Sequence, residues 1–341
     1  MTDEMAVEVE DLRRVYRVKS GERIALDSIS FDVSQGELFG ILGPNGAGKT
    51  TLVRILSTLL HPTSGTARVL GVDVGRGERQ LRRRIGILFG GERGLYTRVT
   101  ARQNLRYFAG LYGIPRKVAD PRIEELLHHV KLDDRADEKV EAYSRGMKQR
   151  LHLARVLVHD PEIIFLDEPT IGLDPIVARE VRGLITELPQ RGKTVVLTSH
   201  YMFEAEALCS RVMVVDSGTV VALDTPQALR QGHPDMACID VDLLESTQDA
   251  EERVRRLVNG EGSVSTHVEG ERQVLTVQSP RGADLVPELQ QVLADCRLGV
   301  VAVREPTLED VYVRLISEGR RRRDTATEAE QAIPTTEKVS R

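Results

Sequence analysis

The chain has 341 residues and a formal net charge of −5, from 52 Asp and Glu against 47 Lys and Arg. This length predicts about two domains. The near-neutral balance gives no overall electrostatic case for nucleic-acid binding, although local basic patches remain possible. The lack of Trp and the 4% aromatic content argue against a stacking platform for single strands. No run approaches the roughly 18 apolar residues that a membrane span needs, and Met1–Glu10 is unlike a signal peptide. The scattered Cys209, Cys238 and Cys296 favour reduced thiols over a zinc site or disulfides. We therefore expect an intracellular, soluble protein that would act at a membrane only through a partner.

The first part of the chain is predicted to form strands followed by one helix. Two strand-like runs lie within Val7–Asp32 on either side of a turn, and a short apolar run, Leu38–Leu42, follows. From Lys49 to Leu60 apolar residues recur with helical spacing until Pro62 ends the pattern. The order is therefore strand, glycine-rich loop, helix.

The middle of the chain alternates strands and helices. A strand at Ile85–Phe89 precedes the glycine-rich connection Gly90–Gly94, and the polar stretch from Ala101 to His159 predicts helices divided at Pro115 and Pro121. The next elements are expected to be strand Ile163–Leu166, helix Val177–Leu188, strand Thr194–Thr198, helix Met202–Cys209, strand Val212–Asp216 and strand Val220–Leu223. This alternation predicts an α/β domain over residues 1–230 with a largely parallel sheet.

A change of composition after Leu229 predicts a second domain over residues 235–318. Its elements are expected to be strand Cys238–Leu243, helix Ala250–Val258, strands Val264–Val268 and Gln273–Gln278, helix Leu285–Leu293, strand Gly299–Val303 and helix Leu308–Leu315. The order β-α-β-β-α-β predicts a small α+β domain of the ferredoxin-like type. The tail, residues 319–341, contains the run Arg320–Arg323 and is expected to be disordered.

A phosphate-binding loop is the most specific motif. It reads Gly43-Pro44-Asn45-Gly46-Ala47-Gly48-Lys49-Thr50 and fits G-x-x-x-x-G-K-[ST] between a strand and a helix. Glycines let successive backbone N–H groups point at one phosphate, and the helix directs its positive end at the same anion. Lys49 adds a positive charge, and Thr50 offers a hydroxyl to Mg²⁺. With Thr51, these residues are predicted to bind a nucleotide; the alternative is a plain glycine turn.

Two carboxylates follow the buried strand Ile163–Leu166. Asp167 falls at the carboxyl end of the strand, where α/β sheets place their ligands, and suits a Mg²⁺ ion. Glu168 is placed to polarise an attacking water as a general base. A surface acid pair is the alternative, but phosphoryl transfer needs an acid for Mg²⁺ beside the phosphate loop.

A third motif narrows the class. The segment Tyr143–Leu151 resembles the ABC signature, Leu-Ser-Gly-Gly-Gln followed by a basic-Gln-Arg sequence. Ser144, Gly146, Gln149 and Arg150 match it, whereas Arg145 stands where Gly is usual, Met147 where Gln is usual and Tyr143 where Leu is usual. In that family the motif contacts the γ-phosphate of ATP held by the other subunit. Taken alone, the segment also fits a basic helix capped by Ser144.

The remaining family motifs occur in order over about Val7–Leu229. Gly172-Leu173-Asp174 resembles the D-loop, His200 the switch histidine that contacts the γ-phosphate, and Tyr16 the aromatic residue that stacks on adenine. Tyr16 could instead be a packing residue, and His200 incidental. The resemblance implies a RecA-like core with a helical subdomain at about residues 95–160, ATP and Mg²⁺ as cofactors, and a homodimer that sandwiches ATP. It assigns catalytic roles to Glu168, His200 and Lys49, metal binding to Thr50 and Asp167, and ATP contacts to Tyr16, the phosphate loop, Ser144, Gly146 and Asp174.

One departure from the family follows the strand Ile85–Phe89. The family usually has Gln here, whereas this chain has Gly90 at the start of Gly90-Gly91-Glu92-Arg93-Gly94. Three interpretations stay open: Glu92 reaches Mg²⁺ or water, the loop couples to a membrane partner through its backbone and Arg93, or it is a glycine loop without a ligand role.

The carboxyl-terminal part points to a subfamily. Residues Arg304–Tyr312 resemble the ending of daunorubicin-resistance-type and nodulation-type ABC ATPases, which pair with separate ABC-2 membrane subunits and mostly export drugs, lipids or polysaccharides. A structural cap, with Pro306 starting a helix and Glu309 and Asp310 in its first turn, is equally compatible. The resemblance implies an export ATPase, peripheral at the cytoplasmic face of the membrane, with no nucleic acid expected. The alternative is a non-transport ABC ATPase acting on nucleic acid or the ribosome, but such proteins usually carry two nucleotide domains or a long coiled coil.

Overall fold

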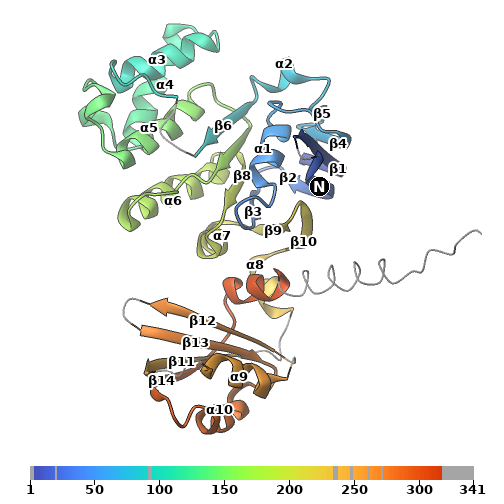
Figure 1. Ribbon diagram of the computed structural model, residues 1–341. Coiled ribbons are helices and arrows are strands. Elements are labelled where there is room, and N and C mark those ends of the chain that lie inside the picture. Colours follow the sequence, from blue (N-terminus) through green and yellow to red (C-terminus); the bar gives the residue numbers. More distant parts are fainter. Residues whose placement is uncertain are drawn as a thin grey trace, which may run out of the picture. The chain divides into compact units, whose positions relative to one another are not determined.

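The computed structural model describes residues 4–19, 21–90, 94–232, 237–245, 249–259, 262–269 and 272–316. Within it the chain divides into two compact units, Met1–Thr225 and Pro226–Arg341, each considered by itself below (Figure 1). Glu92, Arg93 and the tail, residues 319–341, lie outside the described residues, and so do the expectations attached to them.

A six-stranded sheet forms the centre of the first unit. Its order is β10-β9-β3-β8-β7-β6, and every neighbouring pair is parallel except β9 and β10. Both β3 and β7 are buried along their whole length, which explains why they read as unbroken apolar runs. The largely parallel sheet is therefore confirmed, with strands β3 (Leu38–Leu42), β6 (Ile85–Phe89), β7 (Ile163–Asp167), β8 (Thr194–Ser199), β9 (Arg211–Asp216) and β10 (Thr219–Asp224).

A second, antiparallel sheet has the order β2-β1-β4-β5. Its long strands β1 (Met5–Val18) and β2 (Gly21–Ser34) correspond to the first two predicted runs, but β4 (Ser64–Val69), β5 (Val72–Asp73) and the short helix α2 (Glu78–Leu81) were not predicted. In β4 only Ala67 and Val69 are buried, so its sequence carries little apolar signal. Tertiary pairing with β1 makes it a strand.

Helix α1 (Lys49–Leu56) is shorter than predicted. Thr58 has φ +64°, a left-handed conformation that cannot continue an α-helix. Leu59 is 53% exposed, so the apolar pattern there reflects no packed helical face. The expected extension to Leu60 is therefore wrong.

The helical part of the first unit contains α3 (Ala101–Leu111), α4 (Arg116–His129) and α5 (Arg145–Leu157). The predicted break at Pro121 is wrong, because α4 continues through this residue. Proline leaves the carbonyl of Lys117 without its helical donor, but Lys117 is exposed, so water can satisfy it. The described residues of this part also include the 3-10 turns η1 (Asp133–Arg135) and η2 (Val140–Ala142).

After β7 the first unit continues with α6 (Pro175–Gln190), β8 and α7 (Met202–Leu208). Strands and helices thus alternate along this part of the chain. Every parallel strand ends at the same edge of the sheet, where β3 leads into the phosphate loop and β7 ends in Asp167. This edge is where α/β sheets bind ligands.

The second unit begins with α8 (Pro226–Gln231) and contains a four-stranded antiparallel sheet of order β12-β13-β11-β14. In chain order its elements are β11 (Ala237–Glu245), α9 (Ala250–Val258), β12 (Ser263–Glu269), β13 (Arg272–Ser279), η3 (Gly282–Leu285), α10 (Val286–Val292) and β14 (Arg297–Arg304). Residues 308–316 are helical. This order and pairing are those of the ferredoxin-like βαββαβ unit, as the sequence predicted.

Candidate functional site

The phosphate loop connects β3 to α1 and follows a path that only glycine permits at Gly48. This residue has φ +109°, and an added Cβ would lie 2.5 Å from the carbonyl oxygen of Ala25 on β2. The loop therefore packs directly on the antiparallel sheet while its backbone turns into the helix. The predicted loop residues Pro44, Asn45, Gly46, Gly48, Lys49, Thr50 and Thr51 line a cavity of about 440 Å³.

Lys49 is the buried cation of this cavity, with only 5% of its surface exposed. Its Nζ donates to the carbonyl oxygens of Gly43 at 2.6 Å and Pro44 at 3.1 Å and lies 3.6 Å from Glu168 Oε1. Burial lowers the pKa of Lys49, and the charge of Glu168 acts against this shift. A phosphate brought into the cavity would meet a positive charge that is held in place and largely removed from water.

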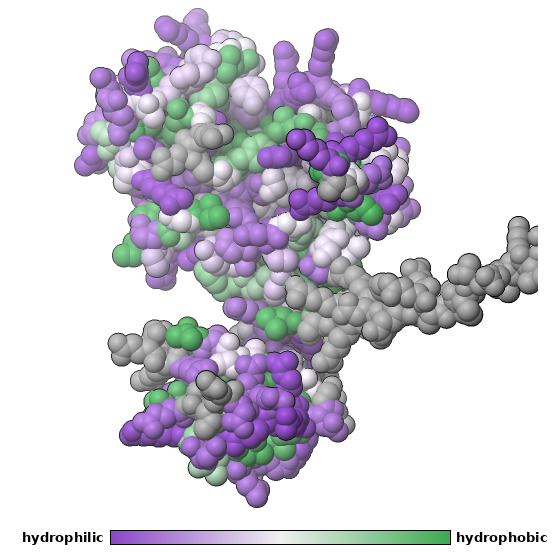
Figure 2. Space-filling view, in the orientation of Figure 1, coloured by the Kyte–Doolittle hydropathy of each residue, from purple (hydrophilic) through white to green (hydrophobic). Residues whose placement is uncertain are grey.

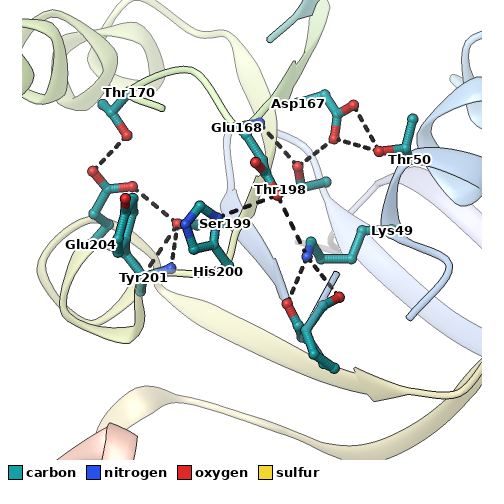
Figure 3. A network of polar contacts seen from close by, with 12 residues as sticks. Lys49, Thr50, Asp167, Glu168, Thr170, Thr198, Ser199, His200, Tyr201 and Glu204 are labelled. Carbon is teal, nitrogen blue, oxygen red and sulfur yellow. Dashed lines mark hydrogen bonds and ion pairs between the residues drawn. The ribbon is translucent and has the colours of Figure 1, made fainter. Parts of the chain in front are cut away.

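Asp167, at the end of β7, is fixed by two hydroxyl groups (Figure 3). Thr50 Oγ1 donates to its Oδ2 at 2.9 Å, and Thr198 Oγ1 donates to its Oδ1 at 2.6 Å. The hydroxyl of Thr50 and the carboxylate of Asp167 are hard oxygen donors of the type that Mg²⁺ prefers beside nucleotide phosphates. These two residues fit the predicted ion, although the described residues contain no cluster of three or more His, Cys, Asp or Glu that could hold a metal by itself.

Glu168 lies between two groups that carry or can carry positive charge. Its Oε1 is 3.6 Å from Lys49 Nζ and 3.4 Å from His200 Nδ1, as Figure 3 shows. The residue has φ +50°, and its N–H donates to both the carbonyl oxygen and Oγ1 of Thr198 at 3.1 Å. Two hydrogen bonds thus hold a backbone conformation that is unusual for a non-glycine residue and aim the carboxylate at the cavity.

A polar network beyond His200 was missed from the sequence. Glu204, which is 2% exposed, accepts hydrogen bonds from Ser199 Oγ at 3.0 Å, Thr170 Oγ1 at 2.6 Å and Arg182 Nη1 at 3.0 Å. It thus joins Ser199, the residue before His200, to Thr170 in the turn that follows Glu168. Thr198 was also missed, because no local pattern distinguishes it from an ordinary strand residue.

Tyr16 lies at the wall of the cavity that the phosphate loop also lines. It lines the cavity together with Arg17, Val18 and Arg23 of the β1–β2 hairpin. The guanidinium of Arg14 lies 4.8 Å from the centre of its ring. An aromatic ring held by a cation on one side can stack on a nucleotide base on the other; its role in binding adenine stays a prediction.

Three predicted site residues do not line the cavity of the phosphate loop or the second cavity beside Asp167 and Glu168: Ser144, Gly146 and Asp174. Ser144 caps α5, accepting from Met147 N at 3.2 Å, and Asp174 caps α6, accepting from Val177 N at 3.0 Å. Gly146 gives room to Val177, whose Cγ1 would lie 2.4 Å from an added Cβ. Within one chain these residues shape helix ends, so the structure does not bring them to the nucleotide cavity of their own chain.

Gly90 occupies the position where the family usually has Gln. It lines the adjoining cavity of about 490 Å³ with Asn45, Thr50, Arg54, Phe89, Asp167, Glu168 and Ile171. An added Cβ would lie 3.2 Å from the carbonyl oxygen of Asp167. Among the described residues, this loop therefore contributes backbone and space beside the two carboxylates.

The fold and these contacts define an ATP-binding cassette, and comparisons with known proteins agree. The family described as "ABC transporter" matches residues 26–171. The daunorubicin resistance ATP-binding protein DrrA2 of Streptomyces coeruleorubidus is 38% identical over 97% of this chain and 99% of its own length. The Nod factor export ATP-binding protein I of Burkholderia lata is 36% identical over 89% of this chain and 96% of its own length.

Solved structures show the same likeness over about two thirds of the chain. A dimeric post-hydrolysis state of an ATP-binding cassette bound to ADP and Pi is 27% identical, with a TM-score of 0.58 over 64% of this chain and 98% of that chain. The cbiO1 protein of Clostridium perfringens, part of an ABC transporter complex, is 29% identical, with a TM-score of 0.61 over 66% of this chain and 90% of that chain. The chain belongs to the ABC transporter family as an ATP-binding protein of the daunorubicin-resistance type.

Proposed function

We propose that ATP hydrolysis at the site around Lys49, Asp167 and Glu168 drives export through a separate membrane subunit of the ABC-2 type. The observation that carries the proposal is the position of Glu168. Its carboxylate lies between Lys49 and His200, next to the Thr50–Asp167 pair. A phosphate-binding cation, a candidate general base and oxygen donors for Mg²⁺ therefore lie next to one another.

The chemistry follows from these side chains. Backbone N–H groups of the phosphate loop and Lys49 bind the β- and γ-phosphates. Thr50 and Asp167 would hold Mg²⁺, which neutralises phosphate charge when bound. Glu168 accepts the proton of the attacking water, and His200 faces the same carboxylate, where it can orient the γ-phosphate. The hydroxyl of Thr198 holds the carboxylate of Asp167 and the backbone of Glu168 in place through hydrogen bonds.

A homodimer would complete the site. Ser144, Gly146 and Asp174 line no nucleotide cavity within one chain, and Ser144 is exposed at the start of α5. In a dimer that sandwiches ATP, these residues would approach the nucleotide bound by the other copy. A dimeric cassette with ADP and Pi among the similar structures supports this arrangement.

The membrane partner and its substrate are proposed from the relatives. Their names refer to daunorubicin resistance, linearmycin resistance and Nod factor export, which suggests export of a drug, antibiotic or lipid-like molecule and does not favour an ATPase acting on nucleic acid. In the described part of the chain, no helix combines the length and apolar character of a membrane span. Peripheral placement at the cytoplasmic face is a separate part of the proposal and rests on the likeness to export ATP-binding proteins.

The helical part of the first unit offers a surface for such a partner. Tyr107, Leu111 and Val118 on α3 and α4 are 46%, 63% and 48% exposed. Figure 2 shows green, apolar patches among the purple side chains on this face of the unit. Exposed apolar side chains of this kind suit a protein contact.

Replacing Glu168 with glutamine tests the proposal. We expect the variant to bind ATP, lose turnover and accumulate an ATP-dependent dimer, because the amide cannot accept the proton from water. Steady-state ATPase assays and light scattering with and without ATP measure these effects. Glu162→Gln removes the same charge at the opposite end of β7, where Glu162 pairs with Arg84, and should behave as wild type. Undiminished hydrolysis by Glu168→Gln would remove Glu168 as the base.

A further inference from the structure

Two side chains of α5 donate to the backbone immediately after Glu168. Arg145 Nη2 donates to the carbonyl oxygen of Ile171 at 3.3 Å, and Gln149 Nε2 donates to the carbonyl oxygen of Pro169. Both contacts reach the turn between β7 and α6. The helix that begins after Ser144 is therefore linked to the segment that carries the proposed base.

The contact of Arg145 depends on a glycine. Gly172 has φ +67°, and an added Cβ would lie 2.4 to 2.6 Å from three atoms of the Arg145 guanidinium. The guanidinium thus packs into the space that any other residue's side chain would fill. Arg145 is exposed, but packing on Gly172 and the hydrogen bond to Ile171 hold its guanidinium against this turn.

A short path of bonds continues from Ile171 to Glu168. The N–H of Ile171 donates to the carbonyl oxygen of Glu168 at 3.2 Å and closes a tight turn. Glu168 itself stands in the left-handed region, with φ +50°. A shift of the Ile171 carbonyl would therefore act on the backbone of Glu168, whose carboxylate is aimed by that conformation.

We propose that Arg145 is a positioning residue that links Ser144 to Glu168. The inference rests on the proposed dimer, in which Ser144 meets the nucleotide of the other copy. Arg145 directly follows Ser144, so the position of Ser144 on that nucleotide is passed through the guanidinium to Ile171 and on to the base. Other family members usually have glycine at this position, which offers no side chain for such a link.

The test compares Arg145→Ala with Arg145→Lys and with Arg122→Ala as a matched control. Arg122 likewise donates to one backbone carbonyl, that of Val158 at 3.2 Å, and also pairs with Asp160 at 3.6 Å, but it lies on α4 and neither contact involves the turn after Glu168. We expect Arg145→Ala to lower kcat about tenfold, as for loss of one hydrogen bond from a charged donor, while ATP affinity of the isolated chain changes less than about twofold. Arg145→Lys should recover part of kcat, because its ammonium can reach a carbonyl, and Arg122→Ala should match wild type.

A double mutant separates positioning from general weakening. Because Arg145 acts through Glu168, adding Arg145→Ala to Glu168→Gln should leave the residual single-turnover rate unchanged. An equal fall in both backgrounds, or a lower melting temperature with kcat at the wild-type value, would overturn the inference. A wild-type chain without ATPase activity would overturn the proposed function as well, whereas an active wild type with an equally active Arg145→Ala variant would overturn this inference alone.

Discussion

Replacing Thr198 with valine removes one hydroxyl from the centre of the site and leaves its shape unchanged. Thr198 is fully buried, and its Oγ1 both donates to Asp167 Oδ1 at 2.6 Å and accepts from the N–H of Glu168 at 3.1 Å. After the change, Asp167 keeps the hydroxyl of Thr50, and the N–H of Glu168 keeps the carbonyl oxygen of Thr198. No charged group is removed, so the variant isolates the effect of the hydroxyl.

The size of the effect follows from the hydrogen bond to a carboxylate. Such a bond stabilises a folded protein by about 1.5 to 3 kcal/mol. Valine recovers part of this through its preference for strands and the burial of its methyl group. We therefore expect the first unit to lose about 1 to 2 kcal/mol of unfolding free energy. Since about 1.4 kcal/mol corresponds to a factor of ten in rate, kcat should fall about tenfold if Asp167 loses its orientation.

Urea unfolding without nucleotide and steady-state ATPase assays measure the two quantities. Thr198→Ser keeps the hydroxyl and loses only a methyl group, so its kcat should stay close to wild type even where its stability falls. If Thr198→Val unfolds and hydrolyses ATP as wild type does, the hydroxyl does not orient Asp167 and Glu168, and the reasoning is refuted.

Three further predictions concern Lys49, His159 and Arg304. Lys49→Ala should weaken ATP binding at least about tenfold in equilibrium titrations, because the buried cation of the phosphate loop is lost; unchanged affinity would contradict its role. Burial lowers the pKa of His159 below its unfolded value of 6.5, so the neutral ring contributes stability above pH 6.5 that is lost as the pH falls through the lower, folded pKa. His159→Gln should flatten this acid loss in urea unfolding, and an unchanged slope would argue against it. Arg304 Nε and Nη1 bind the carboxylates of Asp240 and Asp310 at 2.6 and 2.5 Å. Arg304→Ala should therefore lower the melting temperature of the second unit by an amount equivalent to about 2 kcal/mol. This is less than for a fully buried pair, because the side chain of Arg304 is 34% exposed. Arg281→Ala, which breaks the more exposed pair of Arg281 with Glu288, is the control. If Arg304→Ala lowers the melting temperature less than Arg281→Ala does, this view is contradicted.

The last of these contacts also explains the carboxyl-terminal motif. Burial alone would raise the pKa of Asp310, but hydrogen bonds from Arg304 and Thr307 hold it below its usual value. The carboxylate of Asp310 accepts from Thr307 N at 2.8 Å and from Thr307 Oγ1 at 2.6 Å, and Gln278 donates to its backbone carbonyl. The structural interpretation of this motif is therefore supported: it joins β14 to the helical residues 308–316.

Local patterns in the sequence were enough for much of the fold. The bounds of β3, β6 and α9 match the predicted runs, because an apolar run or a helical period leaves a signal within a few residues. The phosphate loop and the acid pair after β7 were found in the same way, since each is a contiguous motif. The predicted roles of these residues stay predictions that the variants above can test.

Elements that leave no local signal in the sequence could be recognised only from the tertiary structure. The strand β4 is polar and forms because β1 lies beside it. Helix α4 continues through Pro121, where the carbonyl that loses its donor belongs to the exposed Lys117. Arg145 looked like a departure from a motif, and only the position of Ile171 and Gly172 showed what its guanidinium contacts.

The sequence by itself determined the class of ATPase and most of the elements around the phosphate loop and the acid pair, and it predicted which residues would meet a nucleotide. The tertiary structure decided how those residues hold one another: Thr50 and Asp167 are 117 positions apart in the chain, yet their oxygens lie 2.9 Å apart. Thr198 reaches Asp167 from a neighbouring strand, 31 positions further on. Such contacts depend on strand pairing and on packing of a buried sheet edge, and neither leaves a periodic trace in the residues that make them.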